Sequence, residues 1–160
     1  MTIKVGDKLP SVKLKYKTDD GVKDVMTDEL FAGKKVVLFA LPGAFTPTCS
    51  AKHVPGFVQN FDALKKKGVD TIACLSVNDA FVMGAWGKDQ KADGKVMMLA
   101  DGNGEFNKAV DLELDARANG LGIRSKRYAM VVDNGVVKTL NVEAPGAFEV
   151  SSGEAILKAL

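Results

Sequence analysis

The stretch "KKVVLFALPGAFTPTCS", residues 34–50, decides the fold. Val36–Leu41 is an unbroken apolar run rich in β-branched residues, which is typical of a strand buried on both faces. A helix is predicted from about Thr48 to Lys67, and Pro47 suits its first turn because the missing N–H is not needed there. The stretch therefore predicts a strand–turn–helix unit that places Cys49 in the first helical turn.

Strands and helices continue to alternate along the chain. Further strands are predicted at 69–77, 95–101, 127–133 and 136–143, and Asn134–Gly135 is a hairpin signal between the last two. Helices are predicted to begin at Asn78–Asp79, at Gly104 and at Ser151–Ser152, and residues 11–27 suggest a small N-terminal hairpin. We therefore expect one α/β domain over residues 1–160, with a central mixed sheet flanked by helices.

Composition narrows the class of protein. The chain has 160 residues, of which 46% are apolar and 26% charged, and its net charge is +2. Such a balance gives no strong field for nucleic acid or an anionic membrane, so we expect neither as a partner. No secretory signal or long apolar span is visible, which favours a cytoplasmic protein. Two cysteines, Cys49 and Cys74, do not make a disulfide scaffold, and a reactive thiol is more plausible.

Cys49 is the candidate nucleophile. Unpaired N–H groups and the dipole at a helix N-terminus favour the thiolate over the thiol. The hydroxyl of Thr46 is placed to accept from a first-turn N–H and to donate to the thiolate or to a substrate oxygen. Full ionisation of a thiol at neutral pH supplies only about 2 kcal/mol, whereas enzymatic accelerations commonly exceed ~10⁶. A cation and further donors must therefore converge on Cys49.

Other readings of the same residues remain open on sequence grounds. Cys49 could be a buried structural thiol, and a thioredoxin-like disulfide oxidoreductase or a redox-sensing module could also use it. Thr46 stands where the first cysteine of a Cys-x-x-Cys motif would lie, which counts against the oxidoreductase. His53, the only histidine, lies four residues after Cys49 on the same helical face. Cys49, Cys74 and His53 lack paired-ligand spacing, so we expect no metal and no cofactor.

The motif Pro42-x-x-x-Thr46-x-x-Cys49 resembles the active-site motif of the peroxiredoxins. The stretches "HVPGF", "SVNDAFVMGAW", "LADGNGEFNKA" and "GLGIRSKRYAMVVDNGVV" are similar to the type II (atypical, peroxiredoxin-5-like) subfamily. The resemblance implies a thioredoxin-like fold and a thiol peroxidase that reduces hydrogen peroxide and alkyl hydroperoxides. It also implies that Cys49 becomes a sulfenic acid, which glutathione, glutaredoxin or thioredoxin then reduces.

The resemblance also implies roles for single residues. It places the catalytic arginine at Arg127, in preference to the nearby Arg124. Pro42 serves as a former of the active-site turn, and His53 as a hydrogen-bonding support. Cys74 is either a resolving partner, as in plant-like members of the subfamily, or an inert buried thiol. A homodimer is expected through a patch that combines Phe45 with residues 80–86.

Overall fold

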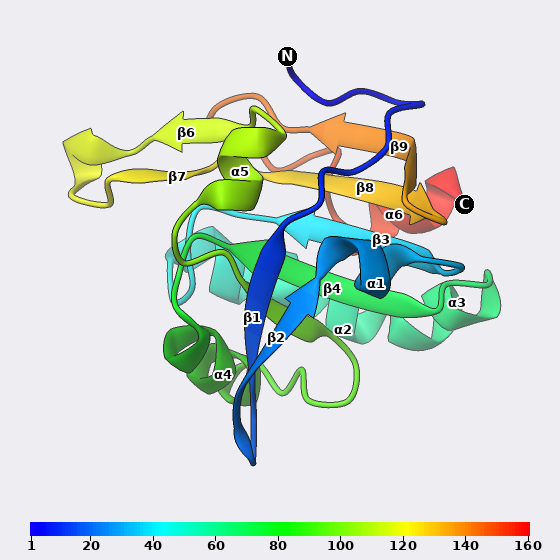
Figure 1. The fold of residues 1–160 in the computed structure, drawn as a ribbon, viewed down its shortest axis with the longest axis horizontal. Coiled ribbons are helices and arrows are strands. Elements are labelled where there is room, and N and C mark those ends of the chain that lie inside the picture. The colour runs from blue at the N-terminus through cyan, green and yellow to red at the C-terminus, as the bar shows by residue number, and fades with distance from the viewer.

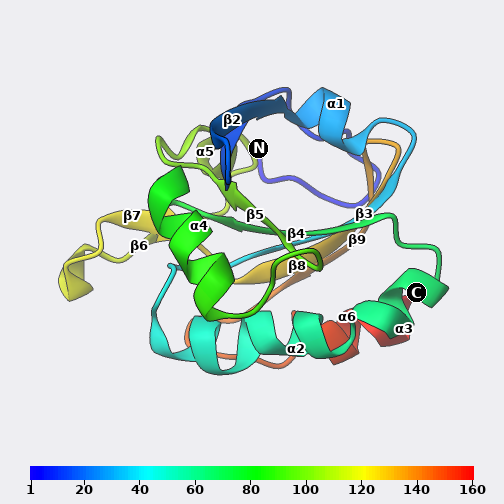
Figure 2. The same ribbon diagram turned by 90° about the horizontal axis from the view of Figure 1, so that it is seen from below.

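The computed structural model describes residues 1–160, and a seven-stranded sheet forms its centre (Figures 1 and 2). The strands lie in the order β2-β1-β5-β4-β3-β8-β9. Their bounds are β1 Lys13–Thr18, β2 Gly21–Met26, β3 Lys35–Ala40, β4 Thr71–Ser76, β5 Met97–Ala100, β8 Tyr128–Asp133 and β9 Val136–Val142. A separate two-stranded sheet pairs β6, Glu113–Asp115, with β7, Ile123–Ser125.

Helices cover both faces of the large sheet (Figure 2). Helices α2 (Val54–Gln59), α3 (Phe61–Lys66) and α6 (Gly153–Ala159) line one face. The other elements are α1 (Thr27–Phe31), the π-helical turn η1 (Cys49–His53), α4 (Ala80–Asp89), α5 (Glu105–Ala109) and the 3₁₀ turn η2 (Arg117–Asn119). The predicted central mixed sheet with flanking helices is confirmed.

The directions of the strands place the loops that follow β3, β4 and β5 at the same edge of the sheet as the segment that precedes β8. Strands β3, β4 and β5 are parallel neighbours, so the carboxyl ends of all three lie at the same edge. Strand β8 pairs antiparallel with β3, with Tyr128 opposite Ala40. The start of β8 therefore lies beside the end of β3.

Strand β3 is buried on both faces, as its sequence predicts. Alternate residues point to opposite sides of a strand. Val36, Leu38 and Ala40 join one apolar cluster, and Val37 and Phe39 join the other. The second cluster is the one that lies under α2, α3 and α6, and it contains both cysteines.

Several local predictions are confirmed. Asn134 and Gly135 have φ values of 49° and 81°, the left-handed pair that a two-residue hairpin turn needs. The side chain of Asp79 caps α4 by accepting from Val82 N–H at 2.8 Å. Ser152 caps α6 in the same way, with its hydroxyl 3.0 Å from the N–H of Ala155.

The prediction of one continuous helix from Thr48 to Lys67 is wrong. Pro55 lacks the N–H that an α-helix would donate, and the chain forms a π-helical turn ahead of it, in which Val54 N–H bonds the carbonyl of Cys49. A second interruption lies at Asn60, whose side chain competes for the carbonyl of Gly56 at 2.7 Å. Val54, Phe57 and Leu64 are buried at helical spacing along this segment, but such spacing does not report local breaks.

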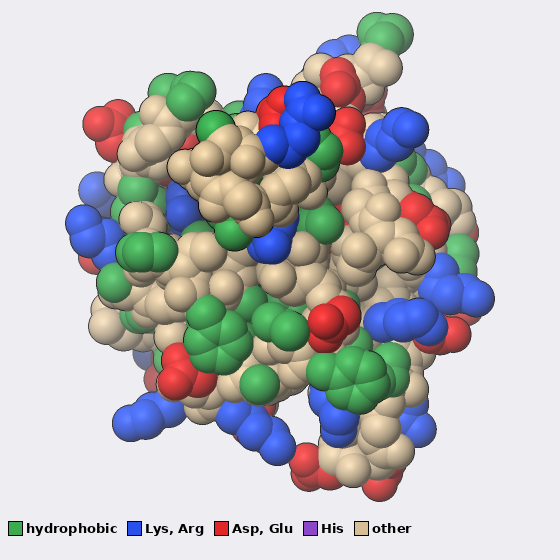
Figure 3. Space-filling view, turned by 90° about the vertical axis from the view of Figure 1, so that its left-hand side faces the viewer, with side chains coloured by type: hydrophobic (Ala, Val, Ile, Leu, Met, Phe, Trp, Pro, Cys, Tyr) green, Lys and Arg blue, Asp and Glu red, His purple; other side chains and the backbone are tan.

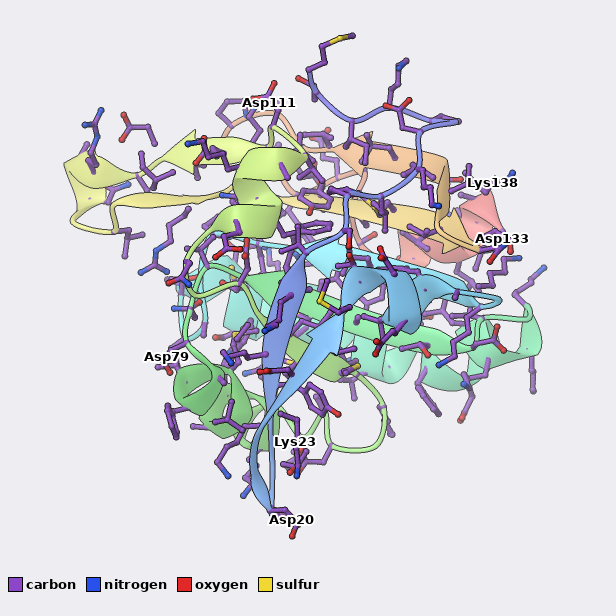
Figure 4. The ribbon with its side chains drawn as sticks, viewed as in Figure 1. Asp20, Lys23, Asp79, Asp111, Asp133 and Lys138 are labelled. Atoms are coloured by element: carbon purple, nitrogen blue, oxygen red, sulfur yellow. The ribbon has the colours of Figure 1, made fainter.

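Charged side chains mark the hairpins at two edges of the molecule. Asp20 lies at the tip of the β1–β2 hairpin with Lys23 nearby in β2, and Asp133 and Lys138 lie at the β8–β9 hairpin, at the right-hand edge of the view (Figure 4). None of the helices has the length and apolar character needed to cross a bilayer.

Candidate active site

Cys49 lies in the loop-to-helix junction that follows β3, and its side chain is fully buried. Arg127 immediately precedes β8 and shares the sheet face of Ala129 and Val131, which is the face that α2 covers. Its Nη2 donates to Cys49 Sγ at 3.2 Å, although the two residues are 78 positions apart in sequence. The topology thus brings a fixed positive charge against the predicted nucleophile.

His53 holds the other side of the same guanidinium. Its Nε2 lies 2.9 Å from the carbonyl oxygen of Ser151, and its Nδ1 lies 2.8 Å from Arg127 Nη1. Because a carbonyl only accepts, Nε2 carries the proton and Nδ1 accepts from Arg127. Burial, together with the adjacent Arg127 charge, lowers the pKa of His53 to about 3. The imidazole is therefore neutral, and both of its nitrogens are engaged.

The turn that precedes Cys49 is fixed by hydrogen bonds to residues from other parts of the chain. Arg124 Nη1 donates to the carbonyl of Pro42 at 3.2 Å, and Ala44 N–H donates to Asn78 Oδ1 at 3.0 Å. Phe45 has a φ of 62° and a half-exposed ring, an uncommon combination for an aromatic residue. The turn is thus a constrained structure, fastened to β7 and to the end of β4.

The Thr46 hydroxyl does not cap the helix, contrary to the sequence prediction. It donates to the carbonyl of Gly43 at 2.7 Å, and no first-turn N–H bonds to it. Closing this short turn engages the hydroxyl proton locally, but the oxygen keeps lone pairs that can accept a bond from an incoming group.

Arg127 and Arg124, the two candidates for the catalytic arginine, make different contacts. Arg127 bonds Cys49 and His53, whereas Arg124 bonds the carbonyls of Leu121 and Pro42. A Cβ on Gly43 would come within 2.6 Å of Arg124 Nη1, so the absence of a side chain there lets the guanidinium approach.

Cys74 is an interior residue of β4, where Phe39 and Met98 are its neighbours on the two adjacent strands. Its thiol is fully buried and unpaired. Burial, with a smaller contribution from Cys49, raises the pKa of Cys74 well above that of an ordinary thiol. The thiol is therefore protonated at neutral pH and has no access to solvent in this conformation.

A cavity of about 370 Å³ opens beside Arg127. Pro42 and Thr48 line one side of it, and the loop at 144–147 lines another. No cluster of three or more His, Cys, Asp or Glu side chains in the chain could hold a metal ion. The arrangement offers a buried thiol against a fixed cation, and the cavity opens on the Arg127 side of this pair, because Arg127 lines it and Cys49 does not.

Sequence reasoning missed the residues that support this arrangement. Asn78 could have been noticed, because it follows a buried parallel strand and must lie at the same edge as the turn after β3. The role of the Ser151 carbonyl had no such signal, since any residue supplies a carbonyl.

Comparison with known proteins gives a consistent picture. The Redoxin family model matches residues 4–157. The chain is 58% identical to chloroplastic peroxiredoxin-2E of Arabidopsis thaliana, over 99% of this chain and 70% of that protein. It is 51% identical to peroxiredoxin-2C of the same plant, over 99% of this chain and 98% of that protein. Reduced Prx3 from Vibrio vulnificus in complex with H2O2 superposes with a TM-score of 0.95, at 57% identity and 99% coverage of both chains.

The expectation of a cytoplasmic protein is wrong on this comparison. The relatives from Arabidopsis thaliana and Oryza sativa that share 58% and 55% identity are both chloroplastic proteins. The expectation relied on the absence of a visible secretory signal and of a long apolar span, and neither feature distinguishes a cytoplasmic domain from a plastid one.

Proposed function

The chain belongs to the Redoxin family and is a peroxiredoxin, a thiol-dependent peroxidase, and from this premise we propose that Cys49 is the residue that attacks the peroxide. The observation that carries the proposal is the 3.2 Å contact between Arg127 Nη2 and Cys49 Sγ. A guanidinium keeps its charge at any working pH, so it favours the thiolate, which is the nucleophilic form.

The reaction balances as a two-electron transfer. The Cys49 thiolate attacks one peroxide oxygen, the S–O bond forms and the O–O bond breaks. The leaving oxygen takes a proton and departs as water or an alcohol, and Cys49 is left as a sulfenic acid. Two thiols of a reductant then return Cys49 to the thiol, with formation of a disulfide and release of water.

We assign four supporting roles. Arg127 stabilises the thiolate and the charge that moves to the leaving oxygen. Thr46 offers its oxygen to the peroxide hydroxyl, while Pro42 shapes the turn. His53, neutral and bonded on both nitrogens, holds the guanidinium in place and does not act as a base.

We place the chain in the type II (atypical) subfamily, with hydrogen peroxide and alkyl hydroperoxides as substrates. The solved relative from Vibrio vulnificus binds H2O2, and it is 57% identical to this chain. The cavity beside Arg127 has space for an alkyl group attached to the peroxide. We propose that residues 1–160 form one redoxin domain, which the family match over 4–157 supports.

For the second half of the cycle we propose reduction of the sulfenic acid by glutathione, glutaredoxin or thioredoxin. A Cys49–Cys74 disulfide is the alternative route. It would require local unwinding, because Cys74 is buried in a central strand and its raised pKa keeps it protonated. Direct reduction by an external thiol needs no such rearrangement.

The test is one equivalent of hydrogen peroxide added to the wild type, Cys49→Ser and Cys74→Ser, followed by intact mass. Addition of one oxygen in the wild type and in Cys74→Ser, absent in Cys49→Ser, is the expected result. Loss of two hydrogens in the wild type but not in Cys74→Ser would show an internal disulfide. Consumption of peroxide by Cys49→Ser at the wild-type rate would refute the assignment of the nucleophile.

A further inference from the structure

Glu143 follows β9 and accepts hydrogen bonds from four donors in a single short loop. The backbone N–H groups of Glu149, Val150 and Ser151 donate to it at 2.8–3.0 Å, and the Ser151 hydroxyl donates at 2.6 Å. Glu143 is itself buried, with 8% of its surface exposed. A buried carboxylate with this many directed donors fixes the path of the loop.

The same loop carries the acceptor that orients His53. The carbonyl oxygen of Ser151 receives the Nε2 proton of His53 at 2.9 Å, while the N–H and hydroxyl of Ser151 bond Glu143. His53 then accepts from Arg127, whose other nitrogen donates to Cys49. The contacts form an unbroken series from the carboxylate to the sulfur.

The packing of the neighbouring segment leaves the loop little freedom. A Cβ on Gly153 would come within 2.7 Å of the carbonyl oxygen of Gly56, so the start of α6 lies directly against the backbone of α2. Glu143 fixes the loop from the sheet side and α2 fixes it from the helix side. The Ser151 carbonyl is therefore held between two rigid supports.

We propose that Glu143 is a positioning residue for the peroxidase reaction, acting through Ser151 and His53 to hold Arg127 on Cys49. The inference rests on the proposed function, because it takes Cys49 as the reacting atom. Glu143 makes no hydrogen bond to the sulfur, although it also lines the cavity beside Arg127. Its effect on the reaction with hydrogen peroxide, which has no alkyl group, passes through the orientation of the Arg127 guanidinium.

Charge, and not only shape, is needed at this position. Partial burial pushes the pKa of Glu143 up, but the bonds from Ser151, Glu149 and Val150 outweigh it and lower the pKa overall. All four donors reach Oε2, and the N–H of Glu149 also reaches Oε1 at 3.0 Å. In Glu143→Gln an uncharged amide oxygen accepts these bonds more weakly than the carboxylate does, and the NH₂ group faces the N–H of Glu149, so the variant should loosen the loop.

The first measurement is the rate constant of Cys49 oxidation by hydrogen peroxide in Glu143→Gln. We expect a decrease of about tenfold, because small misplacements of a catalytic group cost one to two orders of magnitude. The pH profile of Cys49 alkylation should also shift to higher pH. Ser152→Ala is the matched control: it removes the α6 cap at 3.0 Å in the same segment without touching the series. Ser152→Ala should be less stable than the wild type, but its rate constant of Cys49 oxidation and its alkylation profile should be unchanged.

A double-mutant cycle with His53→Gln separates positioning from general weakening of the fold. If Glu143 acts through His53, Glu143→Gln causes little further loss of rate in the His53→Gln background. Losses that multiply in the double variant, or an unchanged rate in Glu143→Gln, would overturn the proposal. If Glu143→Gln does not fold, Ser151→Ala takes its place in the cycle, because it removes only the hydroxyl bond to Glu143.

Failure of this proposal can be told apart from failure of the proposed function. A Cys49→Ser variant that still reduces peroxide refutes the function. An inactive Cys49→Ser with a fully active Glu143→Gln refutes only the role of Glu143.

Discussion

Arg127 illustrates how much depends on the geometry of one side chain. Its two terminal nitrogens point to different partners, Cys49 at 3.2 Å and His53 at 2.8 Å. An ammonium group carries the same charge but lacks the planar fork that makes both bonds. Arg127→Lys should therefore lower the rate constant for peroxide by about 10²–10³, the cost of one misplaced transition-state donor.

Stopped-flow fluorescence can follow this reaction, because Trp86 is the only tryptophan and its indole N–H bonds Ser50, next to Cys49. Arg124→Lys is the control: Arg124 contacts the Pro42 carbonyl and not the sulfur, so its loss should be much smaller. Equal losses in the two variants would contradict the assignment of Arg127.

The lowered pKa of His53 predicts that the free energy of unfolding decreases at low pH. Its pKa is about 3 in the folded protein, against 6.5 for an ordinary histidine. As pH falls below 6.5 the unfolded chain binds a proton that the folded chain does not, so the free energy of unfolding decreases. Between pH 7.5 and 5 the loss should be about 2 kcal/mol. Urea titrations at several pH values measure it.

His53→Gln cannot titrate, so the difference between wild type and variant isolates this group from the carboxylates. The variant should show a flatter dependence over the same range. If wild type and variant have parallel pH profiles, His53 is not neutral in the way that its contacts indicate.

At the scale of single elements, two glycines separate stability from activity. Gly135, with a φ of 81°, has no atom near its missing Cβ, whereas a Cβ on Gly153 would press on the backbone of Gly56 at 2.7 Å. Both alanine variants should be less stable, by about 1–3 kcal/mol. Only Gly153→Ala should also slow peroxide reduction, because it displaces the loop that orients His53. Chemical denaturation and peroxidase assays on the two variants test this, and equal activities would contradict it.

The elements also show what a sequence can and cannot predict. The apolar run of β3, the Asn134–Gly135 hairpin and the caps Asp79 and Ser152 were predictable because each depends on neighbours in the chain. The π-helical turn at Cys49–His53 was missed. Pro55 was visible in the sequence, but its effect depends on how the whole segment packs.

At the scale of the whole molecule, the site exists because the sheet reverses the direction of one strand. Cys49 follows β3, and Arg127 precedes the antiparallel β8. Its place at the start of a predicted helix made Cys49 a candidate nucleophile, but only the resemblance to peroxiredoxins favoured that role over a structural thiol and favoured Arg127 over Arg124. The series from Glu143 to Arg127 could not be predicted, because a backbone carbonyl is one of its members.

The whole molecule also presents apolar side chains on one face, at which we expect the homodimer to form (Figure 3). Met83 and Trp86 are buried, but Phe45 and Phe81 are 54% and 67% exposed. The Phe45 ring lies 6.4 Å from that of Trp86 in α4, between ring centroids, so the exposed rings belong to one region of the surface. A contiguous exposed apolar patch, unlike a single exposed side chain, marks an interaction surface. Phe81→Glu places a charge in that interface and should shift the protein to a monomer. Sedimentation velocity measures the change.

Val5→Glu is the matched control, since Val5 is 57% exposed and lies in the N-terminal segment, away from α4. It should leave the sedimentation coefficient unchanged. The dimer fails as an explanation if the wild type sediments as a monomer at micromolar concentration. If the wild type is a dimer and Phe81→Glu remains one, the interface does not include α4.

Because Phe45 precedes Thr46 in the turn before Cys49, a dimer at this face would also limit access to the thiol. The monomeric variant should therefore react at a different rate with bulky alkyl hydroperoxides than with hydrogen peroxide, relative to the wild type.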